Sequence, residues 1–586
     1  MTLSQALCSD RSEMNPSDDE DEQLNACVIQ RDILHACCQT FIKSPASLSA
    51  STEENLRVSA AIEQGDLSTL RKLPRRPAAF READGGGWLP LHRAACQPSL
   101  EVLRTALTLA GELNLDARTA EGGETALTLA VKAGHARHVR ALLESGARPD
   151  VLNAKNESPL LLAVRASSYE MASALVSRGA WVEQVCGEKR TAVHEAARTG
   201  HVDVLMLLLR NGGRVNHRDI NGVTPLAAAA ERGHVATVEI LLNCGSKVNS
   251  QACNGESVLQ DAAGSGNTPC IQLLLENGAD PNLHSATGHL PIHKAAYVGH
   301  YEAVKLLLQV TSKRLLKEGG LSPVHSAAEG GQSRCLSLLL SRGFDVNYRM
   351  SGRNSQNYGD MRRSALFFAV SNGDRECARV LLAAGAKTDL DPLSCLLVAV
   401  RSGRHGLVRM LLEAKADVNR HFSVVSDTLF PTALQYCLKD PPMMRMLLNA
   451  GYKADSCFRC HHHHDDDDGH RPEDDKKIPF CDFMSLSCLT HLAGPVVRTL
   501  LDYVDRVRIC SKLTSILEKQ PEWTQICSLL GSPRSLSHLC RLLIRRRLTL
   551  KRLNNGEIMN SDVFPPRLRS FILYGEHEPL LGGEQA

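Results

Sequence analysis

The sequence predicts an all-α fold, a solenoid of helix-turn-helix repeats with short hairpin loops, followed by a small helical C-terminal domain. The first observation is that glycines form two sets with a 33-residue spacing, which only Ser167, between the first two members of the second set, interrupts. The second is a Thr-Pro or Ser-Pro pair that recurs before alanine-rich stretches. The third is an aromatic content of only 4% in 586 residues, which is typical of small-residue helical packing. The glycines are Gly146, Gly179, Gly212, Gly245 and Gly278 in one set, and Gly134, Gly200, Gly233, Gly266 and Gly299 in the other.

One repeat illustrates how the residues build the unit. Thr224 supplies an N-cap oxygen, and Pro225 suits the first helical position because it has no N–H to leave unsatisfied. The thin alanine-rich helix ends at Gly233, and a Leu- and Val-rich second helix follows. Gly245 is expected in the left-handed conformation that closes the second helix. A turn then leads to the next unit.

Residues 1–54 precede the repeats and are predicted to be a disordered acidic segment. The acidic run from Asp18 to Glu22 followed by Leu24 resembles the start of a ubiquitin-interacting helix. Cys27 and Arg31 depart from that pattern, which has Ala and Ser there. Ubiquitin binding by this segment is therefore the alternative to a plain acidic tail.

The repeat array is predicted to span residues 55–455, with residues 55–83 as a half-matching cap and about eleven units after it. An insert at 348–363 interrupts the period and is interpreted as an enlarged finger loop. It either contacts a partner or is a tolerated, mobile insertion.

An enzyme is not expected, and no catalytic residue is predicted. His92, His194, His293 and His325 stand at one repeat position, as structural residues do. The chain has no Gly-Lys pair, which excludes a P-loop. The net charge of +2 argues against a nucleic-acid or membrane partner, and neither a signal peptide nor a membrane-spanning helix is expected.

Residues 456–492 are rich in His and Asp and are predicted to be a flexible linker. Cys457 and Cys460 precede the tract 461–470, and such thiol and imidazole groups are zinc ligands. A homopolymeric tract gives no fixed geometry, however, and Cys481 with Cys488 is a poor second pair. We therefore predict no metal and no cofactor. The 20 cysteines form no disulfide framework, so a cytoplasmic chain is expected, with the nucleus as the alternative.

Residues 493–532 return to a helical pattern and are predicted to be a connector that packs on the last repeats. Residues 533–576 form the C-terminal domain, and 577–586 a tail. Within that domain Leu536, Cys540 and Ile544 recur every four residues and form one apolar stripe on a helix. The basic residues around the stripe are interpreted as a solvated face. They are Arg534, Arg541, Arg545, Arg546, Arg547, Lys551 and Arg552.

The repeated unit, with Thr-Pro-Leu and Gly-His at fixed places, resembles the ankyrin repeat. The segment 535–545 resembles the elongin-binding box of a SOCS box, in which Leu, Cys and an aliphatic residue follow at intervals of four. On both grounds the chain is identified as a member of the ankyrin repeat and SOCS box family.

That resemblance implies a function and a set of contact residues. It implies the substrate-recognition subunit of a cullin-RING ubiquitin ligase, a non-catalytic adaptor whose partners are elongin B, elongin C, Cullin-5 and its RING protein. Leu536, Leu539, Cys540 and Ile544 would contact elongin, and Val563, Phe564, Pro565 and Pro566 would contact the cullin. Phe564 replaces a proline of the family motif. An unknown protein substrate would bind the concave face and the 348–363 insert. The alternative is an ankyrin scaffold or competitor that assembles no active ligase.

Overall fold

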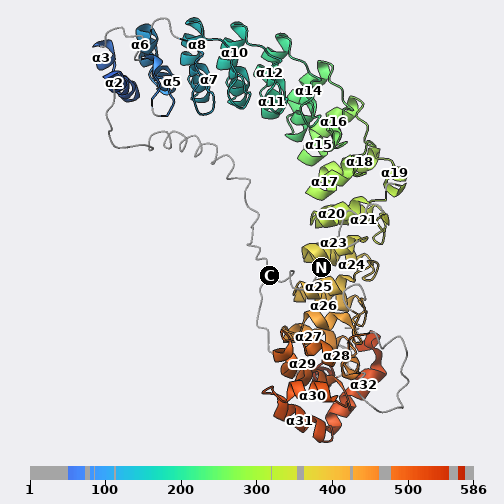
Figure 1. The fold of residues 1–586 in the computed structure, drawn as a ribbon. Helices are drawn as coiled ribbons and strands as arrows, with labels where there is room; N and C mark the ends of the chain where they lie inside the picture. The colour runs from blue at the N-terminus through green and yellow to red at the C-terminus, as the bar shows by residue number, and fades with distance from the viewer. Residues whose placement is uncertain are drawn as a thin grey trace. The chain divides into compact units, whose positions relative to one another are not determined.

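We examined a computed structural model of the chain (Figure 1). It describes residues 50–72, 80–84, 86–110, 114–318, 320–352, 362–422, 427–460, 477–553 and 565–574. The chain divides into two compact units, Met1–Ala147 and Arg148–Ala586. Within the described ranges all regular elements are helices, and β-pairing is limited to two isolated bridges. The predicted all-α class is confirmed.

The first unit contains three helix pairs in its described residues. The first helices of successive pairs, α2, α5 and α7, pack on one another, and so do α3, α6 and α8. Helix α2 begins inside the segment 1–54 that was expected to be disordered. The bounds are α2 (Ala50–Gln64), α3 (Leu67–Lys72), α5 (Pro90–Cys96), α6 (Leu100–Ala110), α7 (Ala126–Lys132) and α8 (Ala136–Glu144).

The second unit opens with nine further pairs among its described residues, visible as successive steps in Figure 1. These are α9 (Pro159–Arg165) and α10 (Tyr169–Ser177), α11 (Ala192–Thr199) and α12 (Val202–Arg210), α13 (Pro225–Glu231) and α14 (Val235–Asn243), α15 (Val258–Ser265) and α16 (Thr268–Glu276), α17 (Pro291–Val298) and α18 (Tyr301–Val310), α20 (Pro323–Glu329) and α21 (Ser333–Ser341), α23 (Ala365–Asn372) and α24 (Arg375–Ala383), α25 (Cys395–Arg401) and α26 (His405–Glu413), and η1 (Thr432–Tyr436) and α27 (Pro441–Asn449). A short extra helix, α19 (Lys313–Glu318), precedes α20.

The pair α13 and α14 shows the helix caps and turn glycines that the sequence predicts. The Thr224 hydroxyl accepts a hydrogen bond from the Ala227 N–H at 3.3 Å, and Pro225 begins α13. Gly233 and Gly245 have φ angles of +71° and +85°, the left-handed values expected after each helix. Ser167, the position that breaks the glycine spacing, has the same conformation, with φ +58°.

The histidines of the repeat connect adjacent pairs. The Leu290 N–H donates to His293 Nδ1 at 3.0 Å, and His293 Nε2 lies 3.2 Å from the Leu321 carbonyl oxygen of the next repeat. Burial lowers the pKa of His293 to about 3, so the ring stays neutral and uses Nε2 as a donor. His92, His194 and His325 make the same two contacts. Their role is structural.

The loops between pairs are joined through their backbones. The N–H groups of Ile220, Cys253 and Ala286 each donate to a carbonyl of the preceding loop, at 2.9, 2.8 and 2.9 Å. The donors are 33 residues apart, so the bond repeats with the array. Only main-chain atoms take part in this bond.

The insert has a closed stem. The Met350 N–H donates to the Arg363 carbonyl at 2.8 Å, and the Met350 side chain is buried. Asp391 accepts from the Arg363 N–H at 2.5 Å and from the Ser364 N–H at 2.9 Å. The middle of the insert, 353–361, lies outside the described residues, so its two interpretations stay open.

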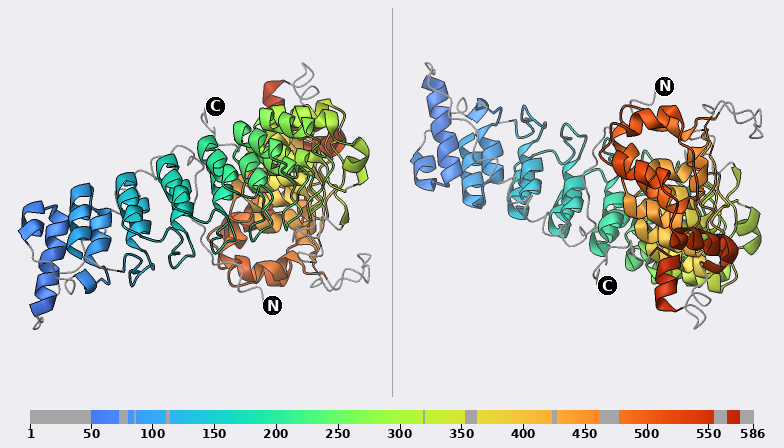
Figure 2. Two further views of the ribbon diagram at one scale, coloured as in Figure 1. Left: turned by 90° about the horizontal axis from the view of Figure 1, so that it is seen from above. Right: turned by 90° about the horizontal axis from the view of Figure 1, so that it is seen from below.

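The C-terminal helices gather beyond the last pair (Figure 1, Figure 2). The described ends of the expected linker 456–492 are packed: Cys457 and Phe458 are buried on one side, and Phe480 and Cys481 on the other. The elements are η2 (Ala454–Phe458), α28 (Phe480–Met484), η4 (Thr490–Leu492), α29 (Ala493–Leu500), η5 (Leu501–Tyr503), α30 (Ser511–Leu517), α31 (Trp523–Gly531), α32 (Leu536–Leu553) and α34 (Pro566–Ile572).

Candidate functional site

Helix α32 carries the predicted elongin-contacting residues and is anchored along one face. His538 Nε2 lies 2.9 Å from the Val504 carbonyl oxygen, which joins the helix to the connector. The Arg545 guanidinium donates to the Asn449 carbonyl at 2.6 Å, at the end of α27, and to the Ile572 carbonyl at 2.9 Å in α34. Leu542 on the same face is buried. The helix is therefore fixed to the last repeat and to α34 at once.

The basic residues of this helix do not all form a solvated face, which corrects one sequence expectation. Arg541 is buried, and its guanidinium carbon lies 4.1 Å from the centre of the Phe571 ring and 4.4 Å from that of Tyr574. Burial lowers the pKa of Arg545. Carbonyl oxygens and aromatic faces replace the water that both guanidinium groups lose. Arg546 and Arg547 are exposed, as expected.

The face of α32 that carries Leu536 and Cys540 is open. Leu536 is 77% exposed, Leu543 56% and Leu539 37%, and Cys540 is also exposed. We call Leu536, Leu539, Cys540 and Leu543 the apolar stripe. An exposed stripe of large apolar side chains on an otherwise anchored helix is typical of a protein-binding surface.

Two residues differ from the predicted set. Ile544 is only partly exposed, because it packs against the buried Ile572 of α34, so it does not extend the stripe. Leu543 was not predicted. Its spacing of seven residues from Leu536 is the signal that places it on the same helix face.

The predicted cullin-contacting segment is described in part. Val563 and Phe564 lie outside the described residues. Pro565 precedes α34 and Pro566 is its first residue, and both side chains are exposed. The acidic run 18–22 and the tract 461–470 also lie outside the described ranges.

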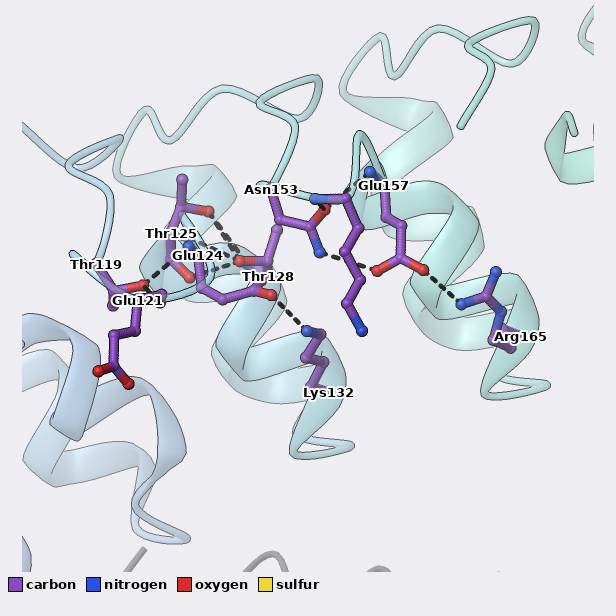
Figure 3. Close-up of polar contacts among 10 residues, drawn as sticks. Thr119, Glu121, Glu124, Thr125, Thr128, Lys132, Asn153, Glu157 and Arg165 are labelled. Atoms are coloured by element: carbon purple, nitrogen blue, oxygen red, sulfur yellow. Dashed lines mark hydrogen bonds and ion pairs between the residues drawn. The ribbon is translucent and has the colours of Figure 1, made fainter. Parts of the chain in front are cut away.

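The first helices of the array carry charged side chains that pair along and between repeats. In the first unit Lys132 pairs with Glu124, and in the second the Arg165 guanidinium lies 2.6 Å from a Glu157 oxygen (Figure 3). Arg165 also reaches Glu195 of the next repeat at 3.2 Å. The surface of α9, α11, α13, α15 and α17 is called the first-helix face below.

An acidic group lies farther along the first-helix face. Burial, together with the nearby Glu256 and Glu231 carboxylates, raises the pKa of Asp261 to about 8. Lys294 approaches Glu256 at 3.2 Å. The array also exposes single large apolar side chains, including Trp181, Ile220 and Tyr297. Such side chains, on a rigid backbone, are the means by which a repeat array recognises a protein.

Within the described ranges, no helix is both long enough and apolar enough to cross a lipid bilayer.

Comparison with known families agrees with the repeat architecture. The family model described as Ankyrin repeats (3 copies) matches residues 58–153, 91–185, 146–219, 207–285, 259–350 and 351–422. The chain belongs to the ankyrin-repeat family.

Two similar curated proteins carry the name of an ankyrin repeat and SOCS box protein. The mouse protein named Ankyrin repeat and SOCS box protein 14 is 45% identical over 282 residues, which are 47% of this chain and 48% of that protein. The human protein of that name is 41% identical over 299 residues, 45% of this chain and 51% of that protein. The chain thus spans about half the length of these two ankyrin-repeat relatives.

A third relative carries an unrelated name. A bovine protein named Dynein axonemal heavy chain 12 is 46% identical over 250 residues, 42% of this chain and 70% of that protein.

Within the ankyrin repeat and SOCS box family, the stretches 125–134, 289–293 and 391–400 favour member 15, with member 14 as the alternative. The mouse and human relatives carry the name of member 14. The preference for member 15 stays a prediction.

Proposed function

We propose that the chain is the substrate-recognition subunit of a cullin-RING ubiquitin ligase. The observation that carries this proposal is the apolar stripe on α32, exposed while the opposite face of the helix is anchored to the last repeat and to α34. The names of the mouse and human relatives include a SOCS box, which supports the proposal that this chain contains one.

In this proposal elongin C covers the apolar stripe. Leu536 projects farthest and enters an apolar pocket of elongin C, while the small Cys540 lets the two surfaces approach closely. Leu539 and Leu543 complete the contact. Ile544 contributes indirectly, since its contact with Ile572 holds α32 against α34. Elongin B joins through elongin C.

Cullin-5 and its RING protein would bind through the segment 563–566. Exposed prolines at the start of α34 suit a surface contact because they are already rigid. The chain itself then needs no catalytic group. Holding a substrate lysine near the charged conjugating enzyme raises its effective concentration, and the adaptor accelerates transfer by proximity alone.

The substrate would bind the first-helix face and the finger loop formed by the insert 348–363. The charged and apolar side chains described above would set its specificity, and the closed stem at Met350 and Arg363 would fix where the loop starts. The substrate itself is a protein of unknown identity.

Co-purification from a cell extract tests the proposal. The intact chain is compared with Leu536→Ala and with Leu486→Ala, and the eluates are probed for elongin C and Cullin-5. Leu486 is a matched control because it is 50% exposed in the same unit and lies outside α32. We expect both partners with the intact chain and with Leu486→Ala, and neither with Leu536→Ala.

Two results would contradict the proposal. Elongin C without Cullin-5 would indicate that Phe564 prevents cullin binding. It would favour the alternative, an ankyrin scaffold or competitor that assembles no active ligase. Neither protein with the intact chain would remove the SOCS-box assignment. Thermal unfolding of each variant is the control for folding, because an exposed Leu→Ala change should leave the midpoint unchanged.

A further inference from the structure

Three cysteine side chains meet where the array joins the C-terminal helices. The sulfur atoms of Cys460, Cys481 and Cys510 all lie within 4.8 Å of one another. The three residues come from distant segments: Cys460 follows η2, Cys481 lies in α28, and Cys510 caps the start of α30. The sequence analysis paired Cys481 with Cys488, which is exposed and outside this group.

The segment that carries Cys481 is held in place by contacts that do not depend on its thiol. The Ile478 N–H donates to the Asp427 carbonyl at 2.8 Å, and the Leu429 N–H donates to the Ile478 carbonyl at 3.0 Å. The Phe480 ring lies 5.4 Å, edge-on, from the ring of Phe430. These contacts fix the start of α28, and therefore Cys481, against the last repeat.

A salt bridge holds the segment that carries Cys510, the third cysteine, beside α28. Lys512 Nζ lies 2.7 Å from a carboxylate oxygen of Asp482, which ties α30 to α28 beside the two thiols. Cys481 and Cys510 are buried, and Cys460 is half-buried. Of the three side chains, Cys460 is therefore the one in contact with solvent.

The geometry points to a binding site for a thiolate-preferring divalent metal ion, and we propose that Cys460, Cys481 and Cys510 ligate Zn²⁺. In a tetrahedral site with Zn–S bonds of about 2.3 Å, neighbouring sulfurs lie about 3.8 Å apart. The group is already close to this arrangement, and small rotations about the side-chain bonds complete it. Among the described residues no fourth His, Cys, Asp or Glu atom joins the three, so the fourth ligand is identified by experiment.

A metal ion here would act as a structural staple. It would join the end of the array, the helix after the His/Asp tract and the connector, closing two loops of the chain. Binding requires the folded arrangement of all three segments, so it would stabilise the fold by mass action. Helix α32, which is anchored on the same connector, would be held more firmly as a consequence.

The test uses the full chain, stripped of metal under reducing conditions and titrated with Co²⁺ and then Zn²⁺. We expect one equivalent of Co²⁺ to give the near-ultraviolet charge-transfer absorption of cobalt–thiolate bonds, and Zn²⁺ to displace it. Histidine and carboxylate groups of the tract 461–470 give no such absorption. X-ray absorption of the Zn²⁺ form identifies the fourth ligand and should report three sulfur neighbours.

Variants decide which thiols are involved. Cys460→Ser, at the half-buried position, should fold and should weaken Zn²⁺ binding by at least about tenfold. Cys481→Ala should abolish the charge-transfer absorption. Cys488→Ser, an exposed cysteine of the same segment, is the matched control and should bind like the intact chain.

The proposal is overturned by any of three results. One is cobalt binding without the thiolate absorption, which would assign the ion to the His/Asp tract. Another is unchanged binding in Cys460→Ser and Cys481→Ala. The third is a disulfide between two of the three cysteines, found by peptide mass spectrometry of the unreduced native chain.

Discussion

At the scale of single residues, the repeat position of His293 shows which chemical groups a side chain uses to join adjacent repeats. The His293 side chain accepts from the N-cap backbone and donates to the next repeat. Gln260 occupies the same place in its own repeat and makes the same two bonds, with the Ser257 N–H at 2.8 Å and the His289 carbonyl at 2.8 Å. The two bonds therefore depend on an acceptor and a donor at opposite ends of a buried side chain, not on an imidazole, and Leu161 and Ala227 at the same place in their own repeats make neither bond.

A pair of substitutions at His293 tests this requirement. We expect His293→Ala to lower the free energy of unfolding by about 3 kcal/mol, because it leaves a buried N–H and a buried carbonyl without partners and opens a cavity. His293→Gln should cost about 1 kcal/mol or less. Denaturant unfolding measures both. Equal losses in the two variants would show that ring packing, not hydrogen bonding, is responsible.

Ser167 offers a second test at this scale. A left-handed φ of +58° is unfavourable for a residue with a Cβ atom, and glycine removes that strain. Ser167→Gly should therefore raise the free energy of unfolding by about 1 kcal/mol. Ala166→Gly is the matched control, since φ there is −76° and the added backbone freedom should destabilise the chain. Stabilisation in both variants would contradict the explanation.

At the scale of elements, α32 divides its side chains between two tasks. Local spacing predicts the helix and the Leu536–Cys540 stripe. It does not predict that Arg541 is buried and Arg545 half-buried, because their partners, Phe571 and the Asn449 carbonyl, come from distant parts of the chain. Tertiary contacts, not helical periodicity, decide which basic residues face water.

Adjacent leucines of α32 should separate binding from stability. Leu543→Ala removes an exposed side chain, so we expect a thermal midpoint close to that of the intact chain and elongin C binding weaker by about thirtyfold, or about 2 kcal/mol. Leu542→Ala removes a buried side chain and should lower stability by about 2 kcal/mol. Calorimetry on both variants gives both quantities. Full binding by Leu543→Ala would exclude it from the site.

At the scale of the whole molecule, the buried histidines make the array sensitive to acid. Burial lowers the pKa of His194 to about 4 and that of His293 to about 3, and it also lowers the pKa of His325. The unfolded chain, with ordinary histidines near 6.5, binds protons first as pH falls. Their stability contribution is complete above pH 6.5 and decreases as pH falls toward 4.

Thermal unfolding at two pH values tests this linkage. Between pH 7 and pH 5 His194 and His293 should each cost about 2 kcal/mol. His293→Gln should therefore lose less stability over this range than the intact chain. The raised pKa of Asp261 acts in the opposite direction, since the folded chain keeps that proton, and comparing the two proteins cancels its effect. Identical pH profiles would contradict the assignment.

Much of the fold could be predicted from the sequence, because its determinants are local. N-caps, glycines at left-handed positions and the spacing between them specify each helix pair within about thirty residues. Of the residues predicted to contact elongin, Leu536, Leu539 and Cys540 lie on the exposed stripe, whereas Ile544 packs inward. The group of Cys460, Cys481 and Cys510 could not be predicted, because it is assembled by packing between segments that share no motif.

The backbone bonds between successive loops have a consequence for how this molecule can change. The bonds at Ile220, Cys253 and Ala286 are made by main-chain atoms, so they do not depend on which side chains these three residues carry. This part of the cohesion between neighbouring repeats is therefore independent of the side chains at those three positions. The tips are free to diversify, and a library that randomises them can change which protein is recognised without disturbing the framework that presents it.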